Sequence, residues 1–255
     1  MKVYVVANQK GGIGKTTTAT SLASILQDKG YKTLLIDSDL QGNSTDTYRA
    51  LIKDTATLFD VLLDEERIPI SEAIQHTEMG DIIAADPLLR RADSILDADR
   101  ADGMYRLKDA LEELKGYDYV VIDTAPAVNS MLQNCLIAAD EVIIPITADR
   151  YGIQGLAELN NTINATKKRQ NTSLKIAGLL LVKYNKRTLL GKEVKESLDN
   201  IAAQMNTKVF HTSIRECNKT KEAQATKTTL IKYDRKCTTT VDYISFVDEL
   251  LKGDK

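Results

Sequence analysis

The first chemically informative segment of this chain is Asn8–Thr16, which reads NQKGGIGKT and follows the apolar run VYVVA. Glycines at positions 11, 12 and 14 let the backbone curl with its N–H groups facing inward, and a helix that starts near Lys15 adds the positive end of its dipole. This combination is typical of a phosphate-binding loop. We therefore expect Lys15 to reach the β- and γ-phosphates of a nucleotide and the Thr16 hydroxyl to ligate Mg²⁺.

The loop differs from the standard P-loop pattern G-x-x-x-x-G-K-[ST] at two points. The pattern requires glycine at position 9, where the chain has Gln9. Lys10 is an extra cation, and a second ammonium near the phosphates, supplied in trans by another subunit, could stabilise the charge that redistributes as the γ-phosphoryl group departs. The predicted nucleotide-binding residues of the loop are Lys10, Gly11, Gly12, Ile13, Gly14, Lys15, Thr16 and Thr17.

Three aspartates that follow apolar runs are candidates for the metal site and for catalysis. Asp123 ends the run VVID, a position suited to holding Mg²⁺ through water, as the Walker B aspartate does. Asp37 and Asp39 stand two residues apart at the end of another predicted strand. If that strand is extended, their side chains share one side and can reach the metal and the attacking water together.

The elements that must position these residues alternate along the chain. Strands are predicted by the apolar runs at 3–7, 33–39, 81–86, 118–123, 141–147 and 176–182, and helices by the segments 15–29 and 104–116. Gly30 is expected to end the first helix. Because the strand runs are apolar at consecutive positions, both faces of the sheet should be covered, which predicts an α/β fold with a doubly wound, mostly parallel sheet flanked by helices. Ligands of such sheets bind beyond the carboxyl ends of the strands, where all the motifs above lie.

Composition limits the class of protein. With 255 residues, 43% hydrophobic and 27% charged, and no Pro/Gly/Ser-rich linker, we expect one domain over 1–255, without an N-terminal helix-turn-helix domain. No run approaches the roughly 20 apolar residues of a membrane span, so we expect a cytoplasmic protein. The three cysteines form no C-x-x-C pair, which argues against a disulfide framework or a zinc site.

Charge is unevenly distributed, and one segment is strongly basic. Residues 164–240 carry 17 Lys and Arg against 6 Asp and Glu, a net charge of +11, whereas the rest of the chain carries 17 against 30, a net charge of −13. Such asymmetry indicates either nucleic-acid contact or a solvated face. Within this segment, YNKRT nearly matches the N-K-x-D box of GTPases but has Thr188 in place of aspartate. A hydroxyl cannot reproduce the bidentate contact to guanine, so we expect ATP, with Asn185 near the adenine.

The motif K-G-G-x-G-K-T-T is the deviant Walker A motif, and with DSDLQGN and VVIDTAP the chain resembles the ParA family of DNA-partition ATPases, which are related to MinD. The resemblance runs nearly from end to end. It implies that Lys10 crosses the interface of an ATP-bound dimer, that Asp39 orients the hydrolytic water and that Asp37 supports the metal shell. The implied catalytic residues are thus Lys10, Lys15 and Asp39, and the metal residues are Thr16, Asp37 and Asp123.

The same resemblance implies a function. A slow, nucleoid-associated ATPase would form a MgATP-bound dimer that coats double-stranded DNA nonspecifically and leaves it after hydrolysis, which a ParB-like centromere-binding protein would stimulate. The process served would be plasmid, mobile-element or chromosome segregation. Arg187, Arg215 and Lys219 are the predicted DNA contacts, with affinity that falls steeply with salt. Leu40 stands where the family usually carries proline.

Two alternatives share the nucleotide motifs. A MinD-like membrane-associated ATPase should end in a basic amphipathic helix, whereas DYISFVDELLKGDK carries four acids and two lysines, a poor match for anionic lipid. An electron-transfer ATPase of the nitrogenase-reductase type would need two cysteines per subunit to hold an iron–sulfur cluster. Only Cys135 follows the Asp123 segment closely, and we expect it to pack in the core.

Overall fold

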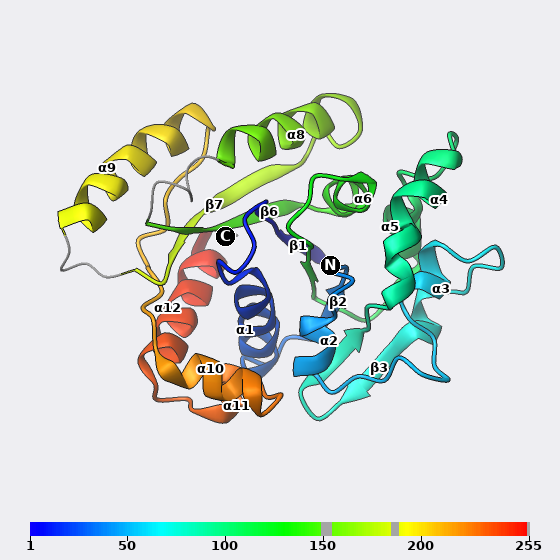
Figure 1. Cartoon of the computed structure of the whole chain (residues 1–255), viewed down its shortest axis with the longest axis horizontal. Coiled ribbons are helices and arrows are strands. Elements are labelled where there is room, and N and C mark those ends of the chain that lie inside the picture. The colour runs from blue at the N-terminus through cyan, green and yellow to red at the C-terminus, as the bar shows by residue number, and fades with distance from the viewer. Residues whose placement is uncertain (149–154, 185–188, 254–255) are drawn as a thin grey trace.

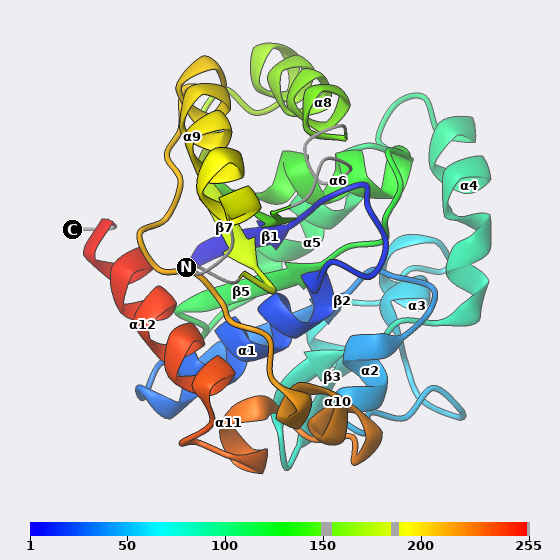
Figure 2. The ribbon, with the colours of Figure 1, turned by 60° about the vertical axis from the view of Figure 1, so that its left-hand side comes forward.

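The sheet at the centre of the protein carries helices on both faces (Figure 1, Figure 2). The computed structural model describes residues 1–148, 155–184 and 189–253. Within that part of the chain the sheet has seven strands in the order β3-β4-β2-β5-β1-β6-β7. They are β1 (Lys2–Val6), β2 (Thr33–Asp37), β3 (Ile74–Thr77), β4 (Gly80–Ile83), β5 (Tyr119–Asp123), β6 (Glu141–Thr147) and β7 (Lys175–Val182). All neighbouring strands pair in parallel except β3, which is antiparallel to β4, and this confirms the predicted mostly parallel sheet.

The helices divide between the two faces and the carboxyl edge of the sheet (Figure 1). One face is covered by α1 (Lys15–Asp28), α11 (Leu230–Tyr233) and α12 (Thr238–Gly253). The other is covered by α3 (Leu58–Leu62), α4 (Ala92–Ala98), α5 (Arg106–Glu113), α6 (Ser130–Ala138), α8 (Leu156–Arg169) and α9 (Leu189–Gln204). The short helices α2 (Asn43–Thr47) and α10 (Asn218–Ala225) follow at the carboxyl ends of the strands, and two 3₁₀ turns span Ile70–Ala73 and Pro87–Arg91.

Successive strand residues enter two different hydrophobic cores. In β1, Val3 and Val5 belong to the core under α3, α4, α5, α6, α8 and α9, whereas Tyr4 and Val6 belong to the core under α1 and α12. Because side chains alternate across a strand, a sheet with two covered faces needs apolar residues at consecutive positions. This is the physical origin of the runs from which the strands were predicted.

Helix α1 begins and ends at glycines. Gly14, its N-cap, has a φ of 101° and makes no side-chain cap bond, so the first N–H groups of the helix are left for a ligand. At the other end, Gly30 has a φ of 92°. Its N–H donates to the Gln27 carbonyl at 2.9 Å, and that of Tyr31 donates to the Leu26 carbonyl at 3.1 Å, which is a Schellman motif. Gly30 therefore ends the helix, as predicted.

Each edge strand of the sheet contacts another part of the chain, through a side chain at β3 and through the backbone at β7. At the β3 edge, the side-chain amide of Gln75 accepts from the Leu51 N–H and donates to the Leu51 carbonyl, each at 2.7 Å. At the β7 edge, Leu179 donates to Lys208 at 2.8 Å and accepts from Phe210 at 3.0 Å. The sequence did not predict β3, because IQHT is short and half polar and lacks the apolar run of a central strand.

The C-terminal helix α12 packs along α1 with its apolar face inward (Figure 2). The Tyr243 hydroxyl lies 3.0 Å from the Thr18 hydroxyl of α1. Phe246, which is fully buried, meets Phe210 edge to face with ring centroids 4.9 Å apart. Among the described residues, no helix is both long and apolar enough to cross a bilayer.

Replacing Phe246 by alanine should lower the free energy of unfolding by about 3–5 kcal/mol, because the change removes a buried ring and leaves a cavity between α12 and the sheet. Urea denaturation followed by circular dichroism measures this. Val241→Ala on the same helix, where 44% of Val241 is exposed, should cost less than about 1 kcal/mol. Equal losses in the two variants would contradict the packing assigned to α12.

Candidate functional site

The carboxyl ends of β1, β2 and β5 bring the predicted motifs to one edge of the sheet. Asp37 at the end of β2 stands in register with Asp123 at the end of β5, and Val6 of β1 pairs with Asp123 from the other side. The phosphate loop starts directly after β1. Segments that are distant in the chain are thereby neighbours, as expected for a doubly wound sheet.

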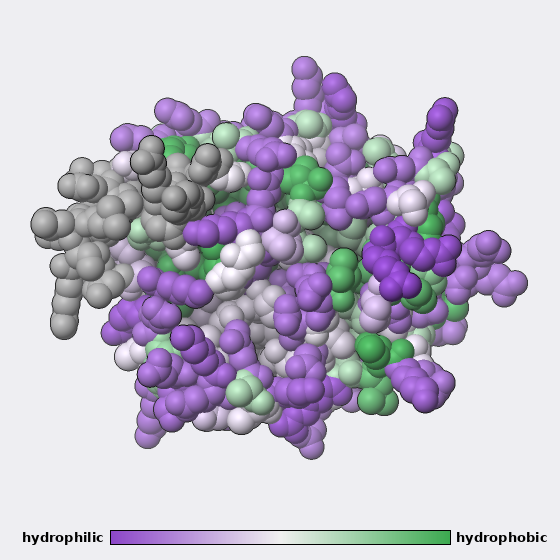
Figure 3. Space-filling model, in the orientation of Figure 1, coloured by the Kyte–Doolittle hydropathy of each residue, from purple (hydrophilic) through white to green (hydrophobic). Residues whose placement is uncertain are grey.

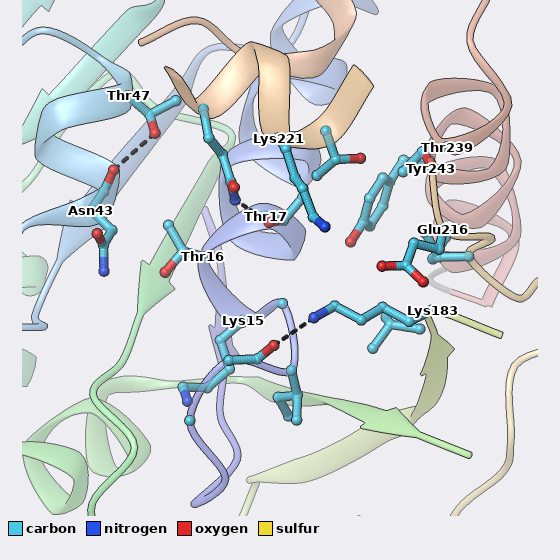
Figure 4. Close-up of a pocket in the computed structure, with 18 of the residues that line it drawn as sticks. Lys15, Thr16, Thr17, Asn43, Thr47, Lys183, Glu216, Lys221, Thr239 and Tyr243 are labelled. Carbon is cyan, nitrogen blue, oxygen red and sulfur yellow. Dashed lines mark hydrogen bonds between the residues drawn. The ribbon is translucent and has the colours of Figure 1, made fainter. Parts of the chain in front are cut away.

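A cavity of about 550 Å³ opens at this edge. Its walls are the phosphate loop and the start of α1, the α2 region with Asn43 and Thr47, and α10 with Lys221 (Figure 4). Lys183 and Tyr243 line the remaining side. In the view of Figure 3, the surface over the phosphate loop is a pale recess surrounded by hydrophilic side chains.

The backbone of the phosphate loop has the conformation that its glycines were predicted to allow. Gly12 and Gly14 have φ angles of 71° and 101°, in the left-handed region that L side chains rarely adopt. A Cβ at either position would meet no other atom within 4 Å, so the backbone conformation, and not crowding, requires glycine there. The loop is anchored by Asn8, whose side chain donates to the Pro145 carbonyl of β6 at 2.8 Å and accepts from Lys10 N–H at 3.0 Å.

The two lysines of the loop have different surroundings. Lys15 is 6% exposed, and its ammonium donates to the Lys10 carbonyl at 3.1 Å. Burial lowers the pKa of Lys15, while the charges of Asp123 and Asp39 act in the opposite direction. The Lys10 ammonium instead lies 3.3 Å from the Thr147 hydroxyl at the end of β6 in the same chain. Within one chain, Lys10 thus points to its own sheet edge.

Asp37 is fully buried, and both of its oxygens accept hydrogen bonds. One accepts from the Asp39 N–H at 3.1 Å, and the other from the N–H and hydroxyl of Thr45, each at 2.8 Å. Burial and the nearby charge of Asp123 raise the pKa of Asp37 to about 7. Asp37 therefore supports the turn of Asp39 and the helix α2 from beneath the cavity. It does not itself line the cavity.

Asp123 keeps one oxygen without a partner. Its Oδ2 accepts from the Ser44 hydroxyl at 2.8 Å, whereas its Oδ1 is buried and makes no hydrogen bond to any described residue. Burial raises the pKa of Asp123 to about 6, although the Ser44 hydroxyl, which donates to Oδ2, and the nearby Thr16 hydroxyl, which makes no hydrogen bond to Oδ1, oppose the rise. A buried carboxylate oxygen of this kind is stabilised by a cation, so the donors present fit Mg²⁺. The described residues contain no group of three or more His, Cys, Asp or Glu that could hold a metal without a ligand's oxygens.

Asp39 lies in a turn and not in an extended strand, because β2 ends at Asp37. Its carbonyl accepts from the Gly42 N–H at 2.8 Å and its carboxylate from the Gln41 N–H at 3.0 Å. The shared side expected for Asp37 and Asp39 required an extended strand through both residues. Asp39 instead faces the cavity, while Asp37 stays behind it.

Two hydroxyls of α2 that hold the aspartates were missed in the sequence. Ser44 binds Asp123, and Thr45 binds Asp37 while its hydroxyl accepts from the Ala85 N–H at 2.8 Å. Adjacent Ser and Thr soon after a strand-end carboxylate were the available signal, since hydroxyls are common donors to buried carboxylates. Through these two hydroxyls, α2 holds both Asp37 and Asp123.

The structure describes only some of the residues predicted to contact the base or DNA. Asn185 and Arg187 lie outside the described residues. Arg215 lines the cavity, and its guanidinium donates to both Asp242 oxygens at 2.8 and 2.7 Å. On α10, Lys219 pairs with Glu222 at 3.2 Å. Arg215 therefore has a structural partner that the sequence did not indicate.

Cys135 is in the hydrophobic core, as predicted. It is fully buried in α6, and its thiol lies 3.6 Å from the Ser38 hydroxyl. Burial raises the pKa of Cys135 to about 12, so the thiol stays protonated at neutral pH. This environment does not suit a ligand of an iron–sulfur cluster.

Known proteins match this chain along its length. The family described as AAA domain matches residues 1–176. The chromosome partitioning protein ParA of Caulobacter vibrioides is 34% identical over 100% of this chain and 96% of that protein. A cobyrinic acid a,c-diamide synthase from Mycobacterium smegmatis, with bound ADP and magnesium, has a TM-score of 0.83 at 29% identity over 99% of this chain and 94% of that one. A putative plasmid partition protein from Borrelia burgdorferi B31, bound to AMPPNP, has a TM-score of 0.77 at 26% identity over 98% and 97% of the two chains.

The identity with ParA covers every part of the chain, the C-terminal elements that build the far wall of the cavity included. Because the similarity extends over the whole chain and not over the phosphate loop alone, the chain belongs to the ParA family of partition ATPases.

Proposed function

We propose that this ATPase binds MgATP in the cavity at the carboxyl edge of the sheet, and that nucleotide binding drives dimerisation and nonspecific binding to double-stranded DNA. Hydrolysis, stimulated by a ParB-like partner, would release the DNA and so serve plasmid, mobile-element or chromosome segregation. The observation that carries the proposal is the buried, unpartnered Oδ1 of Asp123, which lies next to a phosphate loop whose first helical N–H groups have no side-chain cap.

The residues around the cavity fit a magnesium–triphosphate group. The backbone of residues 11–17 and the Lys15 ammonium would hold the phosphates, while the Thr16 hydroxyl and Asp123 would hold Mg²⁺. Asp37 supports this set through α2. When bound, Mg²⁺ neutralises charge on the phosphate oxygens. The Mycobacterium smegmatis and Borrelia burgdorferi relatives, with bound ADP and magnesium and bound AMPPNP, support this assignment.

Asp39 is the residue we propose for orienting the water that attacks the terminal phosphate. It lines the cavity directly after β2, and the Gln41 and Gly42 N–H groups hold its turn in place. A fixed carboxylate can accept a proton from water and hold the water in line, which is the contribution expected of a positioned base in phosphoryl transfer.

Lys10 is the proposed link between nucleotide and dimer. In the single chain its ammonium rests on Thr147. A charge-assisted bond from the Lys10 ammonium to the triphosphate of a second copy would favour pairing only when nucleotide is present.

The packing of α12 favours DNA over membrane as the surface to which the protein binds. The residues that a MinD-like anchor would insert into lipid, such as Phe246, Val247 and Leu250, are buried against α1 and the sheet. The excess of basic residues lies in 164–240, which includes α10 beside the cavity. Its charge suits a phosphate backbone, and nucleoid association would follow from such binding.

Lys15→Ala and Lys10→Ala should separate nucleotide binding from dimerisation. Lys15→Ala should weaken ATP binding by about 100-fold or more, because the variant lacks a buried ammonium that contacts phosphate. Lys10→Ala should bind ATP within about threefold of the unmodified protein yet remain monomeric. Calorimetry and light scattering with a non-hydrolysable ATP analogue measure both effects. A Lys15→Ala protein with unchanged affinity would refute the loop assignment, and a Lys10→Ala dimer would refute the role in trans.

Stability and Mg²⁺ binding should depend on pH in opposite directions. Asp37 and Asp123 have pKa values of about 7 and 6, raised above the ordinary carboxyl value, so the folded state binds more protons than the unfolded state. The free energy of unfolding without Mg²⁺ should therefore fall as pH rises from about 4 to 7. Because protons compete with the cation, MgATP affinity should rise between pH 6 and 8.

Urea denaturation and calorimetry from pH 5 to 8 check both trends. Asp123→Asn is the control, since it removes one carboxylate and with it the charge that raises the pKa of Asp37, so both dependences should become shallower. A free energy of unfolding that increases steadily with pH, with no difference between the two proteins, would count against the buried acidic pair.

DNA binding should require ATP and fall steeply with salt. If Lys219 contacts a phosphate, Lys219→Gln should reduce the slope of log affinity against log salt by about 1 for each phosphate that the variant no longer neutralises. Arg215 is a poor choice for this test, because its replacement would remove the guanidinium that binds both Asp242 oxygens. Lys115→Gln, at the amino ends of the strands, is the control. Filter binding with ATP, ADP or no nucleotide measures the effect, and equal DNA affinity in all three would reject the proposed cycle.

A further inference from the structure

Lys183, which has no part in the chemistry proposed for MgATP, holds the phosphate loop from an adjoining wall of the cavity. It follows β7, and its ammonium donates to the Gly12 carbonyl at 2.8 Å (Figure 4). Gly12 is the loop residue with a φ of 71°. The contact is a charge-assisted hydrogen bond between residues 171 positions apart, so it links the segment after β7 to the phosphate loop.

This bond fixes the orientation of one peptide group in the loop. The Gly12 carbonyl and the Ile13 N–H belong to the same planar peptide, which is trans, as every described peptide bond is. The two groups therefore point in opposite directions. When Lys183 holds the carbonyl, the Ile13 N–H is held facing away from Lys183, as one of the donors that the loop needs for phosphate.

The backbone of Lys183 is itself held in an unusual conformation. Its φ is 52°, in the left-handed region that is uncommon for a residue with a side chain. Two hydrogen bonds enclose it: Ile214 N–H donates to the Leu181 carbonyl at 2.8 Å, and Tyr184 N–H donates to the Ile214 carbonyl at 3.0 Å. The neighbouring strand segment thus keeps Lys183 aimed at the loop.

Lys183 also closes a ring of hydrogen bonds around this side of the cavity. From Ile214 the ring continues through Arg215 to Asp242 of α12, and the adjacent Tyr243 contacts Thr18 of α1 at 3.0 Å. Helix α1 leads back to the phosphate loop, since Thr18 N–H donates to the Gly14 carbonyl at 2.9 Å. Lys183 thereby joins the far wall of the cavity directly to the loop.

We propose that Lys183 is a positioning residue that preorganises the phosphate loop for nucleotide by holding the Gly12 carbonyl. The role rests on the proposed function, because it concerns the same nucleotide site. Preorganisation lowers the ordering cost that binding would otherwise carry. Because the peptide of Gly12 and Ile13 is a fixed part of the loop, the gain in affinity extends to any nucleotide whose phosphates the loop holds.

Lys183→Met retains most of the aliphatic chain and removes the ammonium. Without this charge-assisted hydrogen bond, the binding of ATP and of ADP should weaken by a similar factor of about ten, measured by calorimetry. In hydrogen exchange without nucleotide, the peptide that covers residues 9–17 should exchange faster than in the unmodified protein. Lys183→Arg, which can donate to the same carbonyl, should restore affinity and protection to within about threefold.

Lys221→Met is the matched control, because Lys221 lines the same cavity from α10 (Figure 4). It should leave the exchange of residues 9–17 unchanged. Unchanged affinity and exchange in Lys183→Met, or weaker binding of ATP alone, would overturn the positioning role, the latter by indicating direct contact with the terminal phosphate. If the unmodified protein binds neither nucleotide, the proposed function fails, while the exchange experiment still tests the hold on the loop.

Discussion

Two carboxylates buried side by side at the ends of β2 and β5 are the constraint on which the rest of the site depends. Asp37 and Asp123 are in register on neighbouring strands and have no exposed surface. Burial of two like charges costs free energy unless hydrogen bonds or a cation compensate. The protein supplies Ser44 and Thr45 of α2, which explains why a short polar helix is fixed at this point. One Asp123 oxygen remains without compensation, and it defines where a cation is needed.

The phosphate loop has a complementary requirement. If its N–H groups are to face inward, its carbonyl oxygens need hydrogen-bond donors on the side away from the ligand. Lys15 takes the Lys10 carbonyl and Lys183 takes the Gly12 carbonyl, so two ammonium groups hold the loop in its curled form. Asn8 fixes its beginning to β6. The positive charge collected in this way lies opposite the acidic pair. A bound magnesium–triphosphate group, with charges of both signs, would be matched by this arrangement.

The parts of the structure that could be predicted are those determined by local patterns. The run 141–147 is strand β6 residue for residue, and KGGIGKT needs only its own glycines and the following helix to form a phosphate loop. Strand β3 was missed because its four residues have no apolar run. The partners of the aspartates were missed because they depend on where α2 packs. Likewise, the pairing of Arg215 with Asp242 joins residues 27 positions apart through the packing of α12, which no spacing rule reveals.

The covered β7 edge of the sheet has a consequence wherever copies of the protein lie close together. An open strand edge can recruit the backbone of another molecule and start an unlimited aggregate. Here the chain from Lys208 to Phe210 pairs with Leu179 along the β7 side of the sheet. Pairing of two copies through a backbone ladder at β7 is thereby disfavoured. At this side of the molecule, association of copies would then depend on side-chain surfaces and not on continuation of the sheet.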